Sequence, residues 1–247
     1  MPKDWWKSFF DQNYLEFQET AGTFKHTKKE VNFLVKNLPL KKNHKVLDLC
    51  CGHGRHSLEL AHRGYSVTGL DYSNYELEIA RKLAVKKGLK IKLRQGDARN
   101  FRFAQKFDVI INMFTAFGHG SEEDDEDIIK SVSRNVKRRG KFFIDLRNLA
   151  WLWRNYRAKD KLIFKNSMRV EMARRFDFLT GINHEKRRIY TKKGNKLYES
   201  SLRMYSLKEI AGLLSRHGLK VENYWGSYDG HPLGLDTKRM LVLAQKI

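Results

Sequence analysis

The chain contains few cysteines and no long apolar stretch. Its only cysteines, Cys50 and Cys51, are neighbours in the sequence and cannot form an ordinary unstrained disulfide with each other. No apolar run approaches the roughly 20 residues that a membrane-spanning helix needs. Residues 1–6 lack the charged and apolar regions of a signal peptide. These absences indicate a reducing compartment, and we expect a cytoplasmic protein that makes no membrane contact.

Acidic residues are also scarce relative to basic ones. The 247 residues include 49 lysine and arginine residues against 28 aspartate and glutamate residues, which gives a formal net charge of +21. Residues 151–206 hold fifteen basic residues against five acidic ones. Such a surface attracts polyanions, so RNA and anionic small molecules are both candidate partners. The hydrophobic content of 41% is enough for one α/β domain with an insertion.

A glycine-containing turn follows the first apolar segment. Lys45–Leu49 is typical of a short buried strand, and Gly52 and Gly54 allow a sharp turn before a helix that we expect to begin at Ser57. A dinucleotide-binding fingerprint would require a third glycine where Ser57 stands, and the Gly-Lys-Ser/Thr of a phosphate loop is absent. The turn therefore indicates a nucleoside site without a pyrophosphate cradle.

Three aspartates lie at the ends of three successive expected strands. They are Asp48 in the first strand, Asp71 after the second and Asp97 after the third. A carboxylate accepts strong hydrogen bonds from ribose hydroxyls, and an acidic lining suits a cationic cofactor but repels phosphate. Each aspartate could instead end a strand or cap a helix. Together with the glycine turn, the three favour a nucleoside cofactor.

This series resembles the class I S-adenosylmethionine-dependent methyltransferases. In that family the loop after strand 1 wraps the methionine part of the cofactor, which here involves Asp48, Gly52 and Gly54. The acid after strand 2 binds both ribose hydroxyls and an aspartate after strand 3 meets the adenine amino group; these positions are Asp71 and Asp97. Many members have glycine where this chain has Cys50. The resemblance extends the expected cofactor-binding residues to Cys50, Arg55, Tyr72, Ala98, Asn112 and Phe114.

Further segments resemble small-molecule methyltransferases. The loop Asn112–His119 is similar to the segment after strand 4 in sugar N,N-dimethyltransferases, and Asp145–Asn148 is similar to the end of strand 5 in glycine N-methyltransferases. The string Leu47–His56 resembles a widespread group of bacterial and archaeal methyltransferases. The resemblance implies S-adenosylmethionine as cofactor and S-adenosylhomocysteine as product, and leaves the acceptor open.

The string Cys50-Cys51-x-His53-x-x-His56 superficially resembles a metal site. Adjacent residues that leave a strand point in opposite directions, so the two sulfurs are not expected to converge on one tetrahedral ion. We therefore expect no metal.

Strands and helices alternate up to about residue 148, which predicts a parallel sheet with right-handed crossovers. Thr27-x-x-Glu30 and Ser73-x-x-Glu76 each predict a capping box at the start of a helix. We expect a further helix over residues 121–138, with an acidic first turn and a basic last turn at residues 137–139. The remaining strands are expected at residues 65–70, 90–94, 107–112 and 141–146.

The pattern changes after residue 148. Apolar and polar residues alternate through an expected antiparallel β insertion, with strands at residues 168–178, 182–191 and 196–206 and turns at Thr180-Gly181 and residues 193–195. A helix over residues 207–216 and a closing antiparallel pair at 219–225 and 239–244 follow.

The resulting prediction is an α/β fold. It has a Rossmann-like, seven-stranded, mostly parallel sheet with an antiparallel last strand, helices on both faces, and an inserted antiparallel β cap. The expected divisions are residues 1–150 for an N-terminal helical segment and the cofactor-binding half, 151–206 for the cap and 207–247 for the closing elements.

Several residues are candidates for contact with the methyl acceptor. His119 lies just beyond strand 4, where ligands collect in open α/β sheets, and could act as a base or bind the acceptor; it could equally be a loop histidine bonded to a carbonyl. Tyr14 belongs to an aromatic N-terminal segment that could cover the cofactor, although helix packing also explains such rings. Strand-end positions suggest Arg147, Tyr228 and Arg239 as substrate-binding residues.

We interpret the chain as an enzyme that transfers a methyl group to a nitrogen or oxygen of a small, possibly anionic, molecule by in-line displacement. An RNA methyltransferase that uses the basic cap is the alternative. A non-catalytic nucleoside-binding protein is a third possibility. The sequence is compatible with a monomer or a homodimer.

Overall fold

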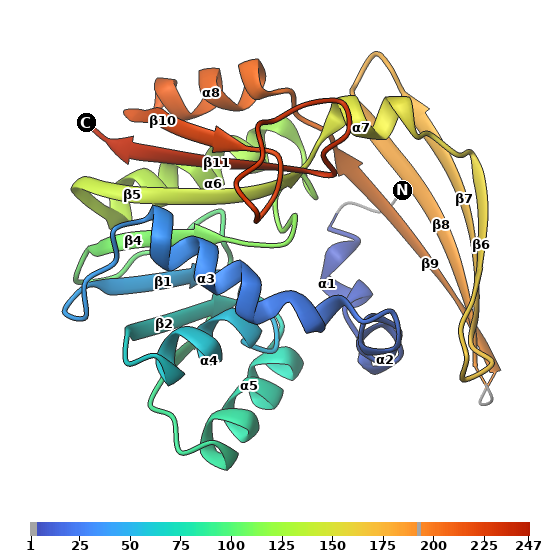
Figure 1. The fold of residues 1–247 in the computed structure, drawn as a ribbon, viewed down its shortest axis with the longest axis horizontal. Coiled ribbons are helices and arrows are strands. Elements are labelled where there is room, and N and C mark those ends of the chain that lie inside the picture. The colour runs from blue at the N-terminus through green and yellow to red at the C-terminus, as the bar shows by residue number, and fades with distance from the viewer. Residues whose placement is uncertain (1–3, 192–193) are drawn as a thin grey trace.

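The computed structural model describes residues 4–191 and 194–247, which contain a seven-stranded sheet with the order β10-β11-β5-β4-β1-β2-β3 (Figure 1). Strands β1 to β5 pair in parallel, and β11 is antiparallel to both β5 and β10. The predicted fold class is therefore confirmed. The strands are β1 Lys45–Leu49, β2 Ser66–Asp71, β3 Lys92–Gln95, β4 Phe107–Asn112, β5 Val136–Arg147, β10 Leu219–Trp225 and β11 Arg239–Lys246.

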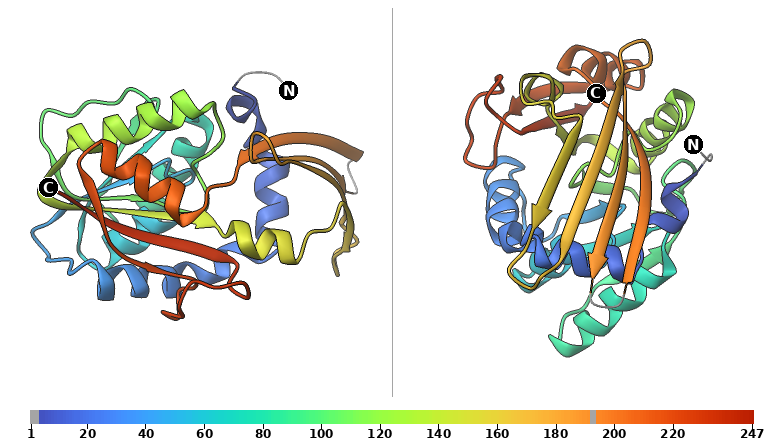
Figure 2. Two further views of the ribbon diagram at one scale, coloured as in Figure 1. Left: turned by 90° about the horizontal axis from the view of Figure 1, so that it is seen from above. Right: turned by 90° about the vertical axis from the view of Figure 1, so that its right-hand side faces the viewer.

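Helices cover both faces of this sheet (Figure 2). On one face, α6 (Glu122–Asn135) and α8 (Leu207–Arg216) bury Ile129 and Ile210 against the strands. On the other, α3 (Thr27–Asn37) and α4 (Arg55–His62) bury their apolar sides, and α5 (Asn74–Lys86) follows β2. No helix within the described ranges is long and apolar enough to cross a membrane.

The basic segment at residues 137–139 does not end helix α6, so this prediction was wrong. The helix ends at Asn135, whose buried amide donates to the carbonyls of Phe101 and Ser131 and accepts from the Phe103 N–H. Strand β5 already begins at Val136, where Lys137 forms an ion pair with Asp108 of β4 at 2.6 Å. Cross-strand pairing therefore overrides the helix-dipole pattern.

The capping box expected at Thr27 is also wrong. A 3₁₀ helix, η1 (Thr23–His26), leads directly into α3, and Thr27 is already helical. Its hydroxyl donates to the Phe24 carbonyl at 2.8 Å and accepts from Arg55 at 2.9 Å. Glu30 binds Arg55 and His56 instead of the helix end. The motif thus contributes to a tertiary network rather than to a local cap.

Residues after β5 form a second, four-stranded antiparallel sheet with the order β6-β7-β8-β9, which we call the cap sheet. Its strands are β6 Lys159–Ile163, β7 Arg169–Asp177, β8 Ile182–Thr191 and β9 Gly194–Arg203. The sequence did not predict β6 or the short helix α7 (Leu149–Arg154). The turn expected at residues 193–195 lies partly outside the described residues. The divisions at residues 150 and 206 stay a prediction.

Two short helices near the N-terminus, α1 (Trp6–Phe9) and α2 (Gln12–Thr20), lie between the large sheet and the cap sheet (Figures 1 and 2). Phe9 and Phe17 are buried in a cluster with cap-sheet residues that include Val170 and Tyr198. We refer to α1 and α2 as the lid, because they pack on the cap sheet and face the carboxyl ends of the central strands.

Candidate active site

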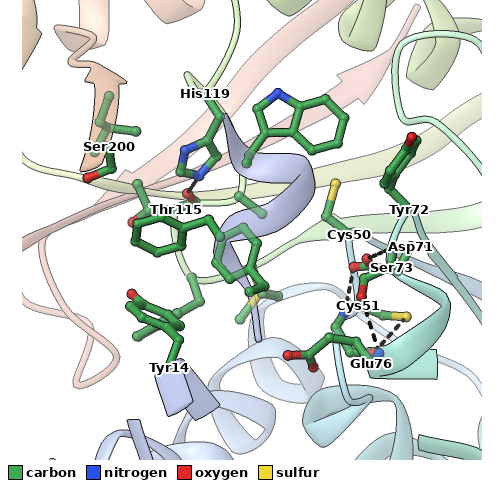
Figure 3. A pocket seen from close by; sticks show the side chains of 18 of the residues that line it. Tyr14, Cys50, Cys51, Asp71, Tyr72, Ser73, Glu76, Thr115, His119 and Ser200 are labelled. Atoms are coloured by element: carbon green, nitrogen blue, oxygen red, sulfur yellow. Dashed lines mark hydrogen bonds between the residues drawn. The ribbon is translucent and has the colours of Figure 1, made fainter. Parts of the chain in front are cut away.

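One cavity of about 470 Å³ lies where the carboxyl ends of the central strands meet the lid and the cap sheet. Such an edge is where open α/β sheets bind ligands. Figure 3 shows Cys50, Asp71 and Tyr72 on one side of the cavity, and Tyr14, His119 and Ser200 on the other. After the ligands that the sequence analysis leads us to expect there, we call the first side the nucleoside half and the second, where a methyl acceptor is expected, the acceptor half.

The β1–α4 turn supports the nucleoside half from behind. Asp48 is fully buried and accepts a hydrogen bond from the Ser57 hydroxyl at 2.7 Å, while its other oxygen has no partner among the described residues. Burial raises the pKa of the Asp48 carboxyl, with the His56 charge and Ser57 acting in the opposite direction. Neither Asp48 nor Gly54 forms part of the cavity wall.

Asp71 lies in the cavity wall at the end of β2. Its two oxygens accept hydrogen bonds from the Gly52 N–H at 2.7 Å and the Ser73 N–H at 2.8 Å. Gly52 has a φ of +53°, a conformation that glycine adopts without strain. Burial raises the pKa of Asp71 to about 6, although both N–H groups lower it. Two fixed donors leave lone pairs that can accept from ribose hydroxyls.

Arg99 joins three carboxylates at the edge of the nucleoside half. It binds Asp97 at 2.6 Å and both Asp4 and Asp124 at 3.0 Å. Burial raises the pKa of Asp97, but the hydrogen bonds from Arg99 outweigh this and lower it. The guanidinium also lies 5.4 Å from the Trp6 ring. Arg99, which the sequence analysis missed, therefore fastens the lid to the strand ends.

Tyr72 and Ala98 also line the nucleoside half. The Tyr72 ring makes an edge contact with Trp6 of the lid, with centroids 5.1 Å apart. Ser73 caps α5 by accepting from the Glu76 N–H, but the predicted capping box is incomplete, because the Ser73 N–H donates to Asp71 and the Glu76 carboxylate binds His53 at 3.2 Å.

Three non-glycine residues in the cavity wall have a left-handed backbone conformation, with positive φ. Cys50 has a φ of +60°, and Phe114 and Thr115 each have a φ of +61°. Each such conformation costs on the order of 1 kcal/mol or more, and strain of this kind concentrates at functional sites. Burial raises the pKa of the Cys50 thiol well above its ordinary range, so this side chain is a neutral thiol.

Arg55 lines the cavity, but other side chains hold it from behind. It binds Glu30 together with His56, and its guanidinium lies 5.1 Å from the Phe114 ring. Burial alone would raise the pKa of Glu30, yet His56 and Arg55 lower it to about 2. The network couples α3 to the glycine turn.

The loop after β4 connects the two halves. Asn112 lies behind the wall, where its amide donates to the Leu49 carbonyl at 3.1 Å and its own oxygen has no partner in residues 4–191 and 194–247. The Phe114 N–H donates to the Asp145 carboxylate at 2.8 Å, and the Thr115 N–H donates to the Asp145 carbonyl at 2.9 Å. Asp145 thus holds the strained loop in place.

His119 lies in the acceptor half. Its Nε2 is 2.8 Å from the Thr115 carbonyl, which can only accept, so Nε2 carries the proton and Nδ1 has a free lone pair (Figure 3). Nδ1 is buried without a partner among the described residues, and the Trp5 ring packs 5.1 Å away. Burial lowers the pKa of His119 to about 4. The imidazole is therefore neutral at physiological pH.

The cap sheet contributes a polar row that the sequence analysis missed. Asn183, Glu185 and Arg187 alternate along β8 and line the cavity with Ser200 of β9. Arg187 binds Glu185 and donates to the Tyr14 hydroxyl at 3.4 Å. The period of two was visible in the sequence, but which face of the strand meets a cavity depends on how the cap sheet docks.

The three strand-end candidates occupy different surroundings. Tyr228 donates to Asp145 at 2.7 Å and does not line the cavity. Arg239 does line it, and is held by Asp145 at 2.6 Å and by the Thr115 hydroxyl at 2.8 Å. Arg147 lines the cavity and is exposed there.

The string from Cys50 to His56 has its side chains turned to separate partners: His53 binds Glu76 and His56 binds Glu30. Across residues 4–191 and 194–247, no three His, Cys, Asp or Glu side chains are arranged to hold a metal ion.

Comparison with known proteins identifies the domain that contains the glycine turn. Residues 46–140 match the family model of a methyltransferase domain. A ubiquinone biosynthesis O-methyltransferase of Pelagibacter ubique is 37% identical over 103 residues. That alignment covers 42% of this chain, and the chain spans only 42% of the relative's length.

Solved structures share the architecture over nearly the whole chain. An S-adenosylmethionine-dependent methyltransferase from Clostridium acetobutylicum has a TM-score of 0.80 at 19% identity, covering 93% of this chain and 98% of its own. CalS10 from Micromonospora echinaspora, an amino pentose methyltransferase solved with S-adenosylmethionine bound, has a TM-score of 0.70 at 19% identity, covering 96% and 98%. The chain therefore has the class I methyltransferase fold and contains a methyltransferase domain.

Proposed function

Because the chain contains a methyltransferase domain and has a class I methyltransferase fold, we propose that the protein transfers a methyl group from S-adenosylmethionine to a nitrogen or oxygen of a small molecule. The observation that carries this proposal is the Asp71 carboxylate, which two main-chain N–H groups fix in the wall of a cavity that also contains His119. A fixed, partly buried carboxylate beside a glycine turn provides paired acceptors for a ribose.

The residues of the nucleoside half fit this cofactor. We propose that Asp71 binds the ribose hydroxyls, that the turn at Cys50 and Gly52 contacts the methionine part, and that Asp97 and Ala98 contact the adenine. When bound, the cofactor supplies an electrophilic methyl group on a positively charged sulfur.

The acceptor half can orient a nucleophile. We propose that the neutral His119 ring accepts a hydrogen bond at Nδ1 from the N–H or O–H of an acceptor that enters beneath the lid, and that Tyr14 borders the same space. A histidine with a pKa of about 4 is a weak base, so its contribution is orientation of the lone pair rather than storage of a proton. Methyl transfer of this kind needs no metal, and we propose that none takes part.

The alternatives receive less support. An RNA acceptor bound through the basic cap sheet would need a free cation of that sheet at the cavity, whereas Arg187, the cap-sheet cation in the described cavity wall, is engaged by Glu185, which also binds Arg174. A non-catalytic nucleoside-binding protein has no need for the polar acceptor half. The cytoplasmic location stays a proposal, supported by two free cysteines at the site.

Transfer of label from methyl-tritiated S-adenosylmethionine to a metabolite extract of the source cells tests the proposal. We expect a labelled small product with the wild-type protein and a loss of at least about tenfold in rate with His119→Ala. His119→Asn, which retains a polar side chain, should lose less. Cofactor affinity should be unchanged in both variants. Full turnover by His119→Ala would remove this residue from the mechanism, and no transfer to any metabolite would refute the activity.

A further inference from the structure

Arg147 differs from the other arginines in the cavity wall. Among the hydrogen bonds and ion pairs found across residues 4–191 and 194–247, none involves its guanidinium. In contrast, Arg239 is held by Asp145, Arg187 by Glu185, and Arg55 by Glu30. Arg147 is thus an exposed cation in the cavity wall without a hydrogen-bonded counter-charge among the described residues.

The surroundings of Arg147 are rich in positive charge. Arg147 and Arg239 are direct partners across β5 and β11, so their side chains project from the same face of the sheet. The positive charges of Arg187 and Arg239 act on Arg147, and the negative charge of Glu185 offsets them in part. Glu185 is already shared between two other arginines. Because the Arg147 side chain is exposed within the cavity, solvent can reach its charge, and a ligand that fills this space would have to provide an anionic partner in place of the solvent.

The position of Arg147 relates it to the proposed reaction. Its charge acts on the neutral His119 ring, so the two side chains share the acceptor half, away from the acidic nucleoside half. The planar guanidinium provides paired donors that match carboxylate and phosphate oxygens. Asn183, whose side-chain oxygen is buried without a partner among the described residues, borders the same space.

We infer that the methyl acceptor carries an oxyanion, a carboxylate or a phosphate, that binds Arg147 while its nucleophilic nitrogen or oxygen is directed by His119. This inference rests on the proposed function and assigns the substrate class of the same site. Arg239 and Arg187, which carboxylates of the protein already neutralise, shape this subsite without providing its free charge.

The test separates labelled products by charge. A metabolite extract is methylated with tritiated cofactor, and the product is passed over an anion-exchange column before and after treatment with alkaline phosphatase. We expect the wild-type product to be retained. Retention abolished by phosphatase identifies a phosphate, and retention that survives identifies a carboxylate. Arg147→Gln should lower labelling of this product at least tenfold, with partial recovery in Arg147→Lys.

Controls separate the two proposals. Arg147→Gln should bind the cofactor as tightly as wild type in equilibrium dialysis. Once the labelled product has been identified, this variant should need a higher concentration of the unmethylated acceptor for half-maximal rate. Arg154→Gln, a change at an exposed arginine of α7, should label the anionic product normally. Labelled product only in the unretained fraction, or equal labelling by Arg147→Gln, overturns the oxyanion subsite and leaves the methyltransferase intact. No labelled product in any fraction overturns both.

Discussion

The pH dependence of cofactor binding provides a quantitative test of the role of Asp71. Burial raises the pKa of this carboxyl from its ordinary value near 3.8 to about 6. Because the folded-state pKa lies above the ordinary value, protonation of Asp71 stabilises the cofactor-free protein. This contribution to folding stability is lost as the pH rises through 6. Ribose hydroxyls donate to a carboxylate, so the ionised form is the one that binds the cofactor.

The size of the effect follows from the ionised fraction. With a pKa of about 6, nearly all molecules are ionised at pH 7.5, but only about one in eleven is ionised at pH 5. If the bound carboxylate stays ionised, affinity at pH 5 is about tenfold weaker, equivalent to about 1.4 kcal/mol. Binding near pH 6 should also release protons.

Equilibrium dialysis with labelled S-adenosylmethionine at pH 5, 6 and 7.5 measures this change, with circular dichroism to verify that the fold persists at each pH. Asp71→Asn, which cannot ionise, should bind weakly and with little dependence on pH. A wild-type dissociation constant that is the same at pH 5 and 7.5, or an equal pH dependence in Asp71→Asn, would refute the reasoning.

Three further predictions concern the scaffold of the site. Glu30, which its two basic neighbours hold at a pKa of about 2, stabilises the fold above pH 4.5 and loses this contribution as the pH falls through 2. Glu30→Gln should therefore cost about 3 kcal/mol in urea unfolding at pH 7; no loss would contradict the network. Gly118 has a φ of +88°, and in Gly118→Ala the new Cβ would lie 2.5 Å from the Arg203 carbonyl oxygen. The midpoint of thermal unfolding should therefore fall by several degrees. An unchanged midpoint would contradict this clash. Tyr205→Phe removes a 2.7 Å hydrogen bond to buried Asp125, and burial raises the pKa of Asp125 to about 7. The substitution should lower the free energy of unfolding by about 1–3 kcal/mol, and by more at pH 8 than at pH 5, because the ionised carboxylate depends more on this bond. Equal losses at the two pH values would indicate that Asp125 does not ionise.

Much of the scaffold could be predicted because its signals are local. Strand β4 and helix α8 have the predicted bounds, because the short apolar core of the strand and the serine cap of the helix are both local signals. The predictions made from Thr27 and Lys137 were wrong because both residues bind side chains that are distant in sequence. Arg55 donates to the threonine hydroxyl, and Asp108 forms an ion pair with the lysine. The side chains of strand β6 are mostly exposed, so its sequence lacks the alternation of apolar and polar residues that predicts a strand.

The site divides in the same way. The position of Asp71 followed from the order of strands and turns, because the ends of parallel strands share one edge of the sheet. The partners of Arg99 could not be predicted, since its three carboxylates come from the residues before the lid, from the loop after β3 and from α6. The free charge of Arg147 was also hidden, because a sequence shows an arginine but not whether an acid reaches it.

The most direct test of the central claim is calorimetric titration of S-adenosylmethionine into the wild-type protein and into Asp71→Ala at pH 7.5. The ribose role of Asp71 predicts saturable binding to one site in the wild type and binding at least about tenfold weaker in the variant, since charge-assisted hydrogen bonds are lost. No binding to the wild type, or equal affinity in both proteins, would contradict the assignment of this cavity to the methyl donor.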